Sequence, residues 1–216
     1  MTETLSKYKL KKLSFEAFKN GLRLHFDSIL LFQNRSFASA FQLSVLALEE
    51  IAKSDWIEDY YWNSNIHGQP DKEFEQKWLK RLYFHPAKQK YFIRHGEMMK
   101  YSPKFVRIIL DNNLELKKQR ATYVGLDKSK KRVNIKSRIS TPNRIKEIDA
   151  QQQISVLNDF LDEMISLLKA QDYLFDIPEK NQLLNNELKT VINNWEYKSG
   201  IRSKRWIKEW MKTKTK

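Results

Sequence analysis

The segment from Phe37 to Trp62 constrains the fold most, because apolar residues surround it on almost every side of a helix. One side would carry Phe37, Ala40, Phe41, Val45, Leu48, Ile51 and Ala52. At about 100° per residue, the other side would carry Leu43, Leu46, Ile57 and Tyr60. A helix that is apolar all round lies inside a protein rather than on its surface. The segment therefore predicts a central helix with other helices packed around it.

Three charged residues interrupt this apolar helix: Glu49, Glu50 and Lys53. At about 100° per residue they share an arc of roughly a quarter-turn. Burying an unpaired charge is costly, so we expect a polar cleft in which Lys53 and further basic residues pair with the carboxylates. The alternative is an ordinary surface pair between Glu49 and Lys53, which contributes roughly a few tenths of a kcal/mol.

Helix-start signals recur along the chain and predict an all-α fold, an antiparallel helical bundle with one basic insertion. Capping hydroxyls precede four of the helices, at Ser14, Ser36, Ser102 and Thr141, and the last two are followed by proline. The predicted helices cover residues 14–32, 36–62, 72–84, 103–122, 142–172, 178–196 and 202–213. The stretch "NSNIHGQPD" predicts a loop. Residues 123–140 predict a short hairpin or an irregular basic loop.

The net charge of +14 favours a polyanionic partner such as RNA. Eleven Lys or Arg residues lie within 117–146 against one acid, and eight lie within 198–216 against one acid. We expect one helical domain over residues 1–196, with its basic insertion at about 123–140. A basic C-terminal helix or tail would cover residues 197–216.

The chain has no cysteine, which suits a reducing compartment. It shows no apolar secretory signal and no apolar run of about 18 residues that would span a membrane. We therefore expect a soluble cytoplasmic protein.

Four motifs occur in order along the first 125 residues. The first helix has Asn20 and Asp27, and the second has the form A-x-x-L…A-x-E-E-x-x-K, from Ala40 to Lys53. An H-x-x-K motif follows at "HPAK", and K-x-x-x-x-Y-V follows at "KQRATYV". With these motifs, residues 15–125 resemble the AbiV-type abortive infection proteins, bacterial antiphage proteins related to the HEPN superfamily of helical nucleases. The family often has an aspartate after Tyr-Val, where this chain has Gly125.

The resemblance implies a HEPN-like helical bundle, commonly a homodimer, that halts the growth of infected cells. An unregulated ribonuclease would poison its host, so we expect a phage-encoded protein as its trigger or partner. The superfamily's ribonuclease motif is an arginine followed four to six residues later by histidine, and this chain lacks it. Arg81 is too close to His85, and Arg94 directly precedes His95. Lys80 has the right spacing to His85, but the residue type differs. Any ribonuclease site here therefore uses a different set of residues.

The chemistry of metal-free RNA cleavage selects candidate catalytic residues from these motifs: Glu49, Glu50, Lys53, His85, Lys88 and Tyr123. Imidazole exchanges protons near neutral pH, so His85 is the best candidate for acid–base catalysis of RNA cleavage. Glu49 or Glu50 would orient His85 or act as the base, and Lys53 would hold the carboxylates. Lys88 would stabilise the phosphate charge, and Tyr123 would donate a proton or stack on a base.

The basic segments supply candidate nucleic-acid ligands: Lys118, Arg120, Lys130, Lys131 and Arg132. Arginine can bind a phosphate through two parallel hydrogen bonds, which suits Arg120. In the tail, Trp206 and Trp210 lie four residues apart among lysines and would either stack on bases or dock the tail on the bundle. Attachment of the tail to an anionic membrane is a lesser alternative.

Each candidate also has a purely structural interpretation. His85 before Pro86 is a reasonable helix cap, Lys88 a solvated cation, and Arg120 and Tyr123 members of structural pairs. Glu49, Glu50 and His85 would suit a divalent metal, but Lys53 on the same arc would compete with it, so we expect no metal and no cofactor. Two functions stay open: an RNA-cleaving antiphage effector, and a non-catalytic module that binds RNA, a ribosome or a phage protein.

Overall fold

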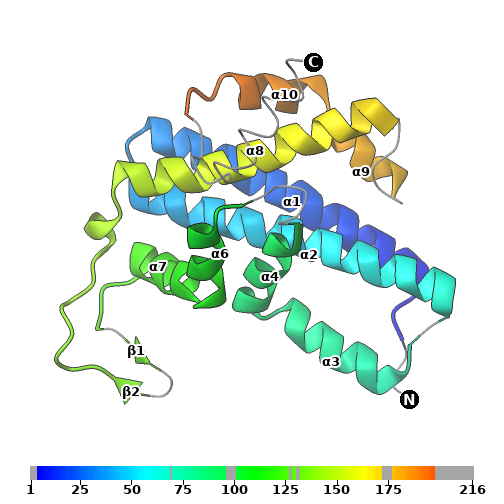
Figure 1. Cartoon of the computed structure of the whole chain (residues 1–216), viewed down its shortest axis with the longest axis horizontal. Coiled ribbons are helices and arrows are strands. Elements are labelled where there is room, and N and C mark those ends of the chain that lie inside the picture. Colours follow the sequence, from blue (N-terminus) through cyan, green and yellow to red (C-terminus); the bar gives the residue numbers. More distant parts are fainter. Residues whose placement is uncertain are drawn as a thin grey trace.

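The computed structural model describes residues 4–68, 70–95, 101–126, 128–129, 132–171 and 177–197. Two long antiparallel helices, α1 (Lys7–Gln33) and α2 (Phe37–His67), form the centre of an all-α bundle (Figure 1). In Figure 1, α8 (Glu147–Gln171) lies on the upper side of this pair. On the lower side lie α4 (His85–Phe92), α6 (Pro103–Leu110) and α7 (Asn113–Thr122). The predicted all-α helical bundle is confirmed.

The central position of α2 is also as predicted. It packs against α1, α4, α7 and α8, and its Val45, Leu48 and Ile51 are fully buried. The two long helices approach closely at Gly21 of α1, where a Cβ atom would lie only 2.7 Å from Ile51 Cγ1. Glycine is required at this crossing, because any side chain would push α1 away from α2.

The start of α1 differs from the prediction. Ser6 caps the helix, because its Oγ accepts a hydrogen bond from the backbone N–H of Lys9 at 3.3 Å. Ser14, the predicted cap, lies inside the helix and is buried. Its hydroxyl donates to the backbone oxygen of Ser54 at 3.0 Å, so it joins α1 to α2.

Three further boundaries differ from the prediction. Helix α2 continues past Trp62 to His67 and ends at Gly68, whose φ of +83° is accessible to glycine. The predicted helix over 103–122 is divided at Asn112, a residue with φ of +58°, into α6 and α7. A short 3₁₀ helix, η2 (Pro142–Arg144), precedes α8, so the long helix begins later than residue 142.

The remaining helices are short. They are α3 (Lys72–Leu82), the 3₁₀ turn η1 (Ile93–His95), α9 (Pro178–Leu183) and α10 (Asn186–Asn193). The predicted helix over 178–196 is therefore two helices, because Asn185 caps a new one through the backbone N–H of Leu188 at 3.0 Å. The predicted helix over 202–213 lies outside the described residues. None of the described helices is long and apolar enough to cross a lipid bilayer.

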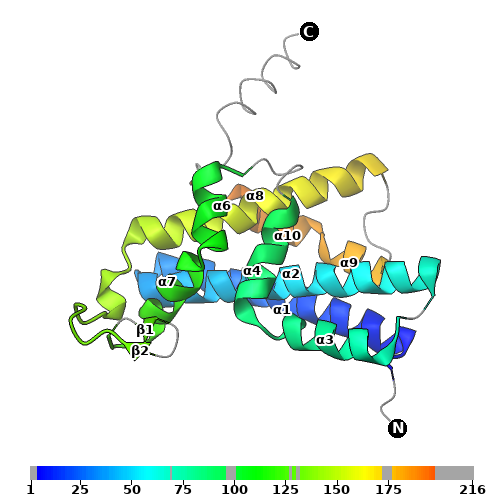
Figure 2. The ribbon, with the colours of Figure 1, turned by 60° about the horizontal axis from the view of Figure 1, so that its bottom comes forward.

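The basic insertion contains a hairpin, one of its two predicted forms. Strand β1 (Lys128–Ser129) pairs antiparallel with β2 (Arg132–Val133), and Gly125 bridges to Ser140 below them. The hairpin projects beyond α7 at one end of the bundle, and the start of α1 lies at the other end (Figure 2).

A second apolar cluster attaches α3 to the ends of α1 and α2. Its members are Leu10, Ile57, Tyr60, Trp78 and Leu82. Tyr60 stacks on Trp78 with ring centroids 4.0 Å apart, and its hydroxyl donates to Glu75 Oε2 at 3.0 Å. This packing fixes the turn between α3 and α4, which leads directly into His85.

His25 is a fully buried histidine between α1 and α8. Its Nε2 lies 2.7 Å from Asn158 Oδ1, and an amide oxygen only accepts, so Nε2 carries the proton of a neutral ring. Burial lowers the pKa of His25 from 6.5 to about 4, although the Asn158 hydrogen bond opposes the shift.

We predict that the free energy of unfolding decreases as the pH falls from 6.5 to about 4 and that His25 causes part of this decrease. Over this range the unfolded chain binds a proton at His25 that the folded chain does not. The contribution reaches about 3 kcal/mol. Urea unfolding across this range should show a shallower pH dependence for His25→Gln than for the wild type. The exposed His67, changed to Gln, serves as the control and should keep the wild-type slope; equal slopes for both variants would contradict the prediction.

Candidate functional site at Glu49 and His85

Three helices place charged and polar side chains around one carboxylate, that of Glu49 on α2. Helix α4 contributes His85, Lys88 and Gln89, whose spacing of three and four residues puts them on one face of the helix. Helix α7 contributes Lys118. Both α4 and α7 pack against α2, so these faces meet at Glu49.

Both oxygens of Glu49 are fully engaged. Oε2 lies 2.5 Å from His85 Nδ1, and Oε1 accepts hydrogen bonds from Gln89 Nε2 and Lys118 Nζ, each at 2.7 Å. The Nζ of Lys88 lies 3.7 Å from Oε2. Only 1% of the Glu49 side chain is exposed. A buried carboxylate of this kind needs such partners, because leaving it unpaired would cost several kcal/mol.

Glu49 remains ionised in this environment. Burial by itself raises the pKa of its carboxyl group, but the hydrogen bonds from His85, Lys118 and Gln89 and the charge of Lys118 outweigh that effect. The pKa of Glu49 therefore lies below its ordinary value of 4.5. An ionised carboxylate only accepts hydrogen bonds, so Nδ1 of His85 carries the proton.

His85 connects this buried carboxylate to the solvent. Its side chain is 49% exposed, whereas the side chains of Glu49 and Lys88 are 1% and 7% exposed. With Nδ1 donating to Glu49, the opposite ring nitrogen, Nε2, is the one left to exchange protons with a ligand. A carboxylate that holds an imidazole in this way sets both its tautomer and its orientation.

The other charges of the cluster balance one another. Glu50 accepts from Lys53 Nζ at 3.4 Å and lies 3.7 Å from Lys88 Nζ. Glu115 of α7 accepts from Lys118 Nζ at 2.8 Å and from Gln89 Nε2 at 3.0 Å. Three carboxylates, Glu49, Glu50 and Glu115, thus face three ammonium groups, Lys53, Lys88 and Lys118. The cluster is neutral with an uncharged His85.

Five of the six expected catalytic residues come together here, but Tyr123 does not. Glu49, Glu50, Lys53, His85 and Lys88 share the cluster, and the buried ammonium of Lys88 pairs with the two glutamates. Tyr123 lies at the C-terminal end of α7 and is 68% exposed. Within the described ranges it makes no contact with Glu49 or His85.

The expected nucleic-acid ligands separate into three groups. Lys118 is buried against Glu49 and Glu115, so the surface role that we expected for it does not fit its position. Arg120 is exposed on another face of α7. Lys130 and Lys131 lie outside the described residues, and Arg132 is placed in β2 by its backbone alone.

Two members of the cluster, Gln89 and Glu115, were not among the expected site residues. Their sequence signal is their spacing: Gln89 follows His85 by four residues, and Glu115 precedes Lys118 by three. Among the described residues, no group of three or more His, Asp or Glu side chains is arranged to hold a metal ion.

The other acidic residues of α2 form separate contacts. The fully buried Lys180 of α9 pairs with Glu58 and with Asp55, the latter at 3.5 Å. Asp59 accepts hydrogen bonds from Tyr91 and Arg94. These residues anchor α9 and the end of α4 and do not enter the Glu49 cluster.

Comparison with known families identifies a family to which this chain belongs. The family model HEPN_AbiV, described as AbiV, matches residues 9–161 and so includes all of α2, α4 and α7. Comparisons with curated proteins and with solved structures find no match to the chain.

We predict that Glu49→Gln destabilises the fold by about 3 kcal/mol, because it leaves Lys118 and Lys88 buried without their shared carboxylate. Glu50 is more exposed, so Glu50→Gln should have a smaller effect. Glu73→Gln is the matched control: Glu73 pairs with Lys77 at 2.6 Å on the surface, and its loss should leave urea unfolding unchanged. An equal effect of the Glu49 and Glu73 substitutions would contradict the prediction.

The same carboxylate predicts acid sensitivity. A folded-state pKa below 4.5 means that Glu49 stabilises the fold above that pH and that this contribution is lost as the pH falls through the folded-state pKa. Wild-type protein should therefore lose more unfolding free energy between pH 4.5 and more acidic conditions than Glu49→Gln does. Parallel pH profiles below pH 4.5 would show that Glu49 is not ionised in the fold.

Proposed function

Since the chain belongs to the AbiV family of HEPN-superfamily proteins, we propose that it is an antiphage abortive-infection protein that acts on RNA through the Glu49–His85 site. Family membership supports the antiphage role. The RNA-directed chemistry is supported by the site itself and by the net charge of +14.

One observation carries the proposal: a half-exposed His85 whose Nδ1 is held by the buried carboxylate of Glu49 at 2.5 Å. A neutral imidazole with a free Nε2 can act as a general base, and a protonated imidazole can act as a general acid. A histidine that only capped α4 would not require a contact with a buried carboxylate on a different helix.

The proposed reaction is cleavage of an RNA strand by its own 2′-hydroxyl. Nε2 of His85 takes the 2′-hydroxyl proton, the 2′-oxygen attacks the neighbouring phosphorus, and the bond to the 5′-oxygen breaks. The leaving oxygen takes a proton from an acid, and the products are a 2′,3′-cyclic phosphate and a 5′-hydroxyl. Glu49 stabilises the imidazolium that forms in the first step.

The acid for the leaving oxygen would come from a second copy of the chain. Among the described members of the cluster, only His85 is substantially exposed, so one subunit offers one proton-transfer group. A homodimer that brings two His85 side chains to one phosphate would supply both base and acid. This arrangement would replace the Arg-x4–6-His motif that the chain lacks.

The surroundings of His85 suit single-stranded RNA. Tyr83 and Phe84 immediately precede it and are 62% and 60% exposed. Exposed aromatic rings beside a proton-transfer group provide stacking surfaces for unpaired bases. An active ribonuclease would harm its own cell, so we further propose that a phage-encoded protein triggers the activity.

A second candidate function is non-catalytic binding of RNA, a ribosome or a phage protein. It is favoured by the deep burial of Lys88 and Lys118, which pair with Glu49 and hold α2, α4 and α7 together rather than facing the solvent. Under this alternative, charge reversal at Lys130, Lys131 and Arg132 would abolish the antiphage effect, and His85→Ala would not.

We predict that purified protein, mixed with phage-infected cell lysate as the source of the trigger, cleaves RNA and that His85→Ala reduces the rate by about 10²–10⁴-fold. His67→Ala, at an exposed histidine remote from the cluster, should retain wild-type activity. Cleavage in EDTA and a 2′,3′-cyclic phosphate at the product end would match the proposed route.

A folded His85→Ala protein that cleaves RNA at the wild-type rate would rule out this site. Cleavage that needs Mg²⁺ would contradict the metal-free route. Circular dichroism of each variant separates loss of activity from loss of structure.

A further inference from the structure

A second concave site lies on a different face of α7 from the Glu49 cluster. It is a pocket of about 590 Å³ between α7, η2 and the segment that follows β2. Its walls include the apolar side chains of Ile108, Leu116 and Ile145. Volumes of this order are typical of small-molecule sites.

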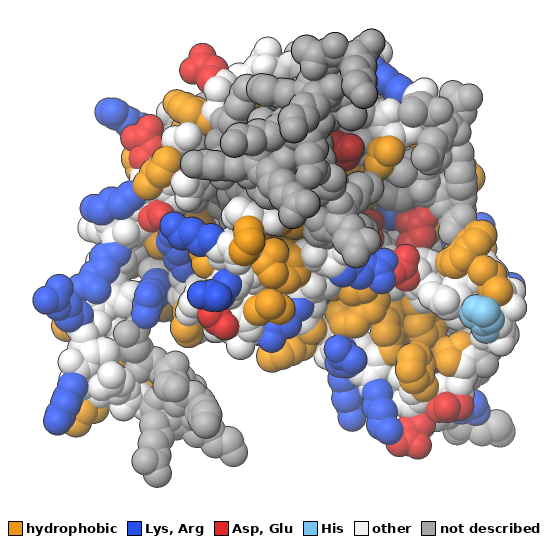
Figure 3. Space-filling view, in the orientation of Figure 1, with side chains coloured by type: hydrophobic (Ala, Val, Ile, Leu, Met, Phe, Trp, Pro, Cys, Tyr) orange, Lys and Arg blue, Asp and Glu red, His pale blue; other side chains and the backbone are white. Residues whose placement is uncertain are grey.

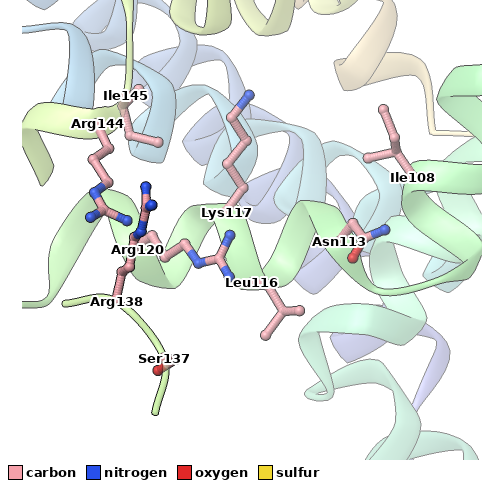
Figure 4. A pocket seen from close by; sticks show the side chains of 9 residues that line it. All are labelled: Ile108, Asn113, Leu116, Lys117, Arg120, Ser137, Arg138, Arg144 and Ile145. Atoms are coloured by element: carbon pink, nitrogen blue, oxygen red, sulfur yellow. The ribbon is translucent and has the colours of Figure 1, made fainter. Parts of the chain in front are cut away.

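Three arginines gather at one end of this pocket. Figure 4 shows Arg120, Arg138 and Arg144 together there, with Ile108 and Asn113 at the opposite end. All three arginines are exposed, and neither Arg138 nor Arg144 forms an ion pair within the part of the chain that the structure describes. A fourth cation, Lys117, is already neutralised by Asp149 at 2.6 Å.

The backbone brings these arginines together from three separate segments. Gly125 and Ser140 exchange two backbone hydrogen bonds of 3.0 and 2.7 Å, which close the hairpin loop and bring residues 137 and 138 back beside α7. The 3₁₀ helix η2 packs on α7 and carries Arg144. The cluster is therefore built by the fold, and Figure 3 shows further Lys and Arg side chains on the same side of the molecule.

We propose that this pocket binds a nucleotide through its phosphate group, with the three guanidinium groups as phosphate ligands and the apolar wall as the surface for the ribose or base. Guanidinium groups bind phosphate oxygens through paired hydrogen bonds, which lysine cannot reproduce. The nucleotide is either a unit of an RNA strand or a free nucleotide. In the RNA form the inference rests on the proposed function, and the pocket anchors the strand at a distance from His85.

The test is fluorescence polarisation with a labelled single-stranded 2′-O-methyl oligonucleotide, which the 2′-hydroxyl route cannot cleave. Arg138→Gln/Arg144→Gln should weaken binding at least about tenfold, because it removes two charged hydrogen-bond donors from the phosphate. The dependence of log affinity on log salt should become shallower by about 0.7 for each phosphate that the variant no longer neutralises. Arg138→Lys/Arg144→Lys keeps the charge and should still bind more weakly than the wild type, because lysine cannot form the paired hydrogen bonds.

The control is Lys9→Gln/Lys12→Gln, which removes the same charge from exposed positions of α1 at the other end of the molecule (Figure 1). It should keep the affinity within about twofold, since salt screens charges at the far end of the molecule from the pocket. An equal loss in both double variants, no loss in the arginine variant, or no binding by the wild type would overturn the proposal.

Competition separates the two sources of the nucleotide. Displacement of the oligonucleotide by ATP, abolished in the arginine variant, assigns the pocket to free nucleotides. Displacement only by unlabelled oligonucleotide assigns it to RNA. This assay measures binding without cleavage, so the two proposals can fail separately. If the protein binds the oligonucleotide through these arginines but cleaves no RNA, the proposed function is wrong and the proposed binding pocket is retained.

Discussion

The ionised carboxylate of Glu49 is the interaction on which the rest of the site depends. It lies in the middle of α2, almost completely buried, and takes hydrogen bonds from α4 and α7. Each helix therefore has a polar contact with the centre of the bundle as well as an apolar one. An apolar residue at this position would remove the carboxylate that the buried Lys118 and Lys88 share and would leave them only Glu115 and Glu50 as counter-charges. The same carboxylate fixes the ring of His85, so the stability of the fold and the chemistry of the site share one residue.

Helix α7 connects the Glu49 cluster to the arginine pocket. Lys118 and Glu115 face the Glu49 cluster, whereas Leu116, Lys117 and Arg120 line the arginine pocket. The proposed strand-binding surface and the proposed proton-transfer group thus lie against different faces of the same short helix. Its orientation is set at Asn112, the left-handed residue that separates it from α6.

Sequence patterns identified the core of the site because they were local. The apolar surroundings of Glu49 predicted a central helix, and the H-x-x-K motif placed His85 and Lys88 one turn apart on α4. The partners on α7 were not predictable in the same way. The rotation of α7 depends on the break at Asn112, which the pattern of residues 103–122 does not reveal. Lys118 was therefore expected to face a nucleic acid at the surface, but its side chain is buried.

The predicted cap at Ser14 was wrong for a similar reason. Its hydroxyl donates a hydrogen bond to the distant Ser54 instead of capping the start of a helix. The arginine pocket depends on a long-range backbone contact too, because only the Gly125–Ser140 bridge brings Arg138 and Arg144 to Arg120.

The proposed chemistry requires that Glu49 holds His85 with Nδ1 protonated and Nε2 available to a substrate. The most direct measurement is a long-range ¹H–¹⁵N NMR spectrum of the histidine side chains at alkaline pH, with the His85 signals assigned by their absence in His85→Ala. We expect the Nδ1–H tautomer for His85 in the wild type and a different tautomer balance in Glu49→Gln. A neutral His85 ring protonated at Nε2 in the wild type would show that Glu49 does not hold the ring in this way.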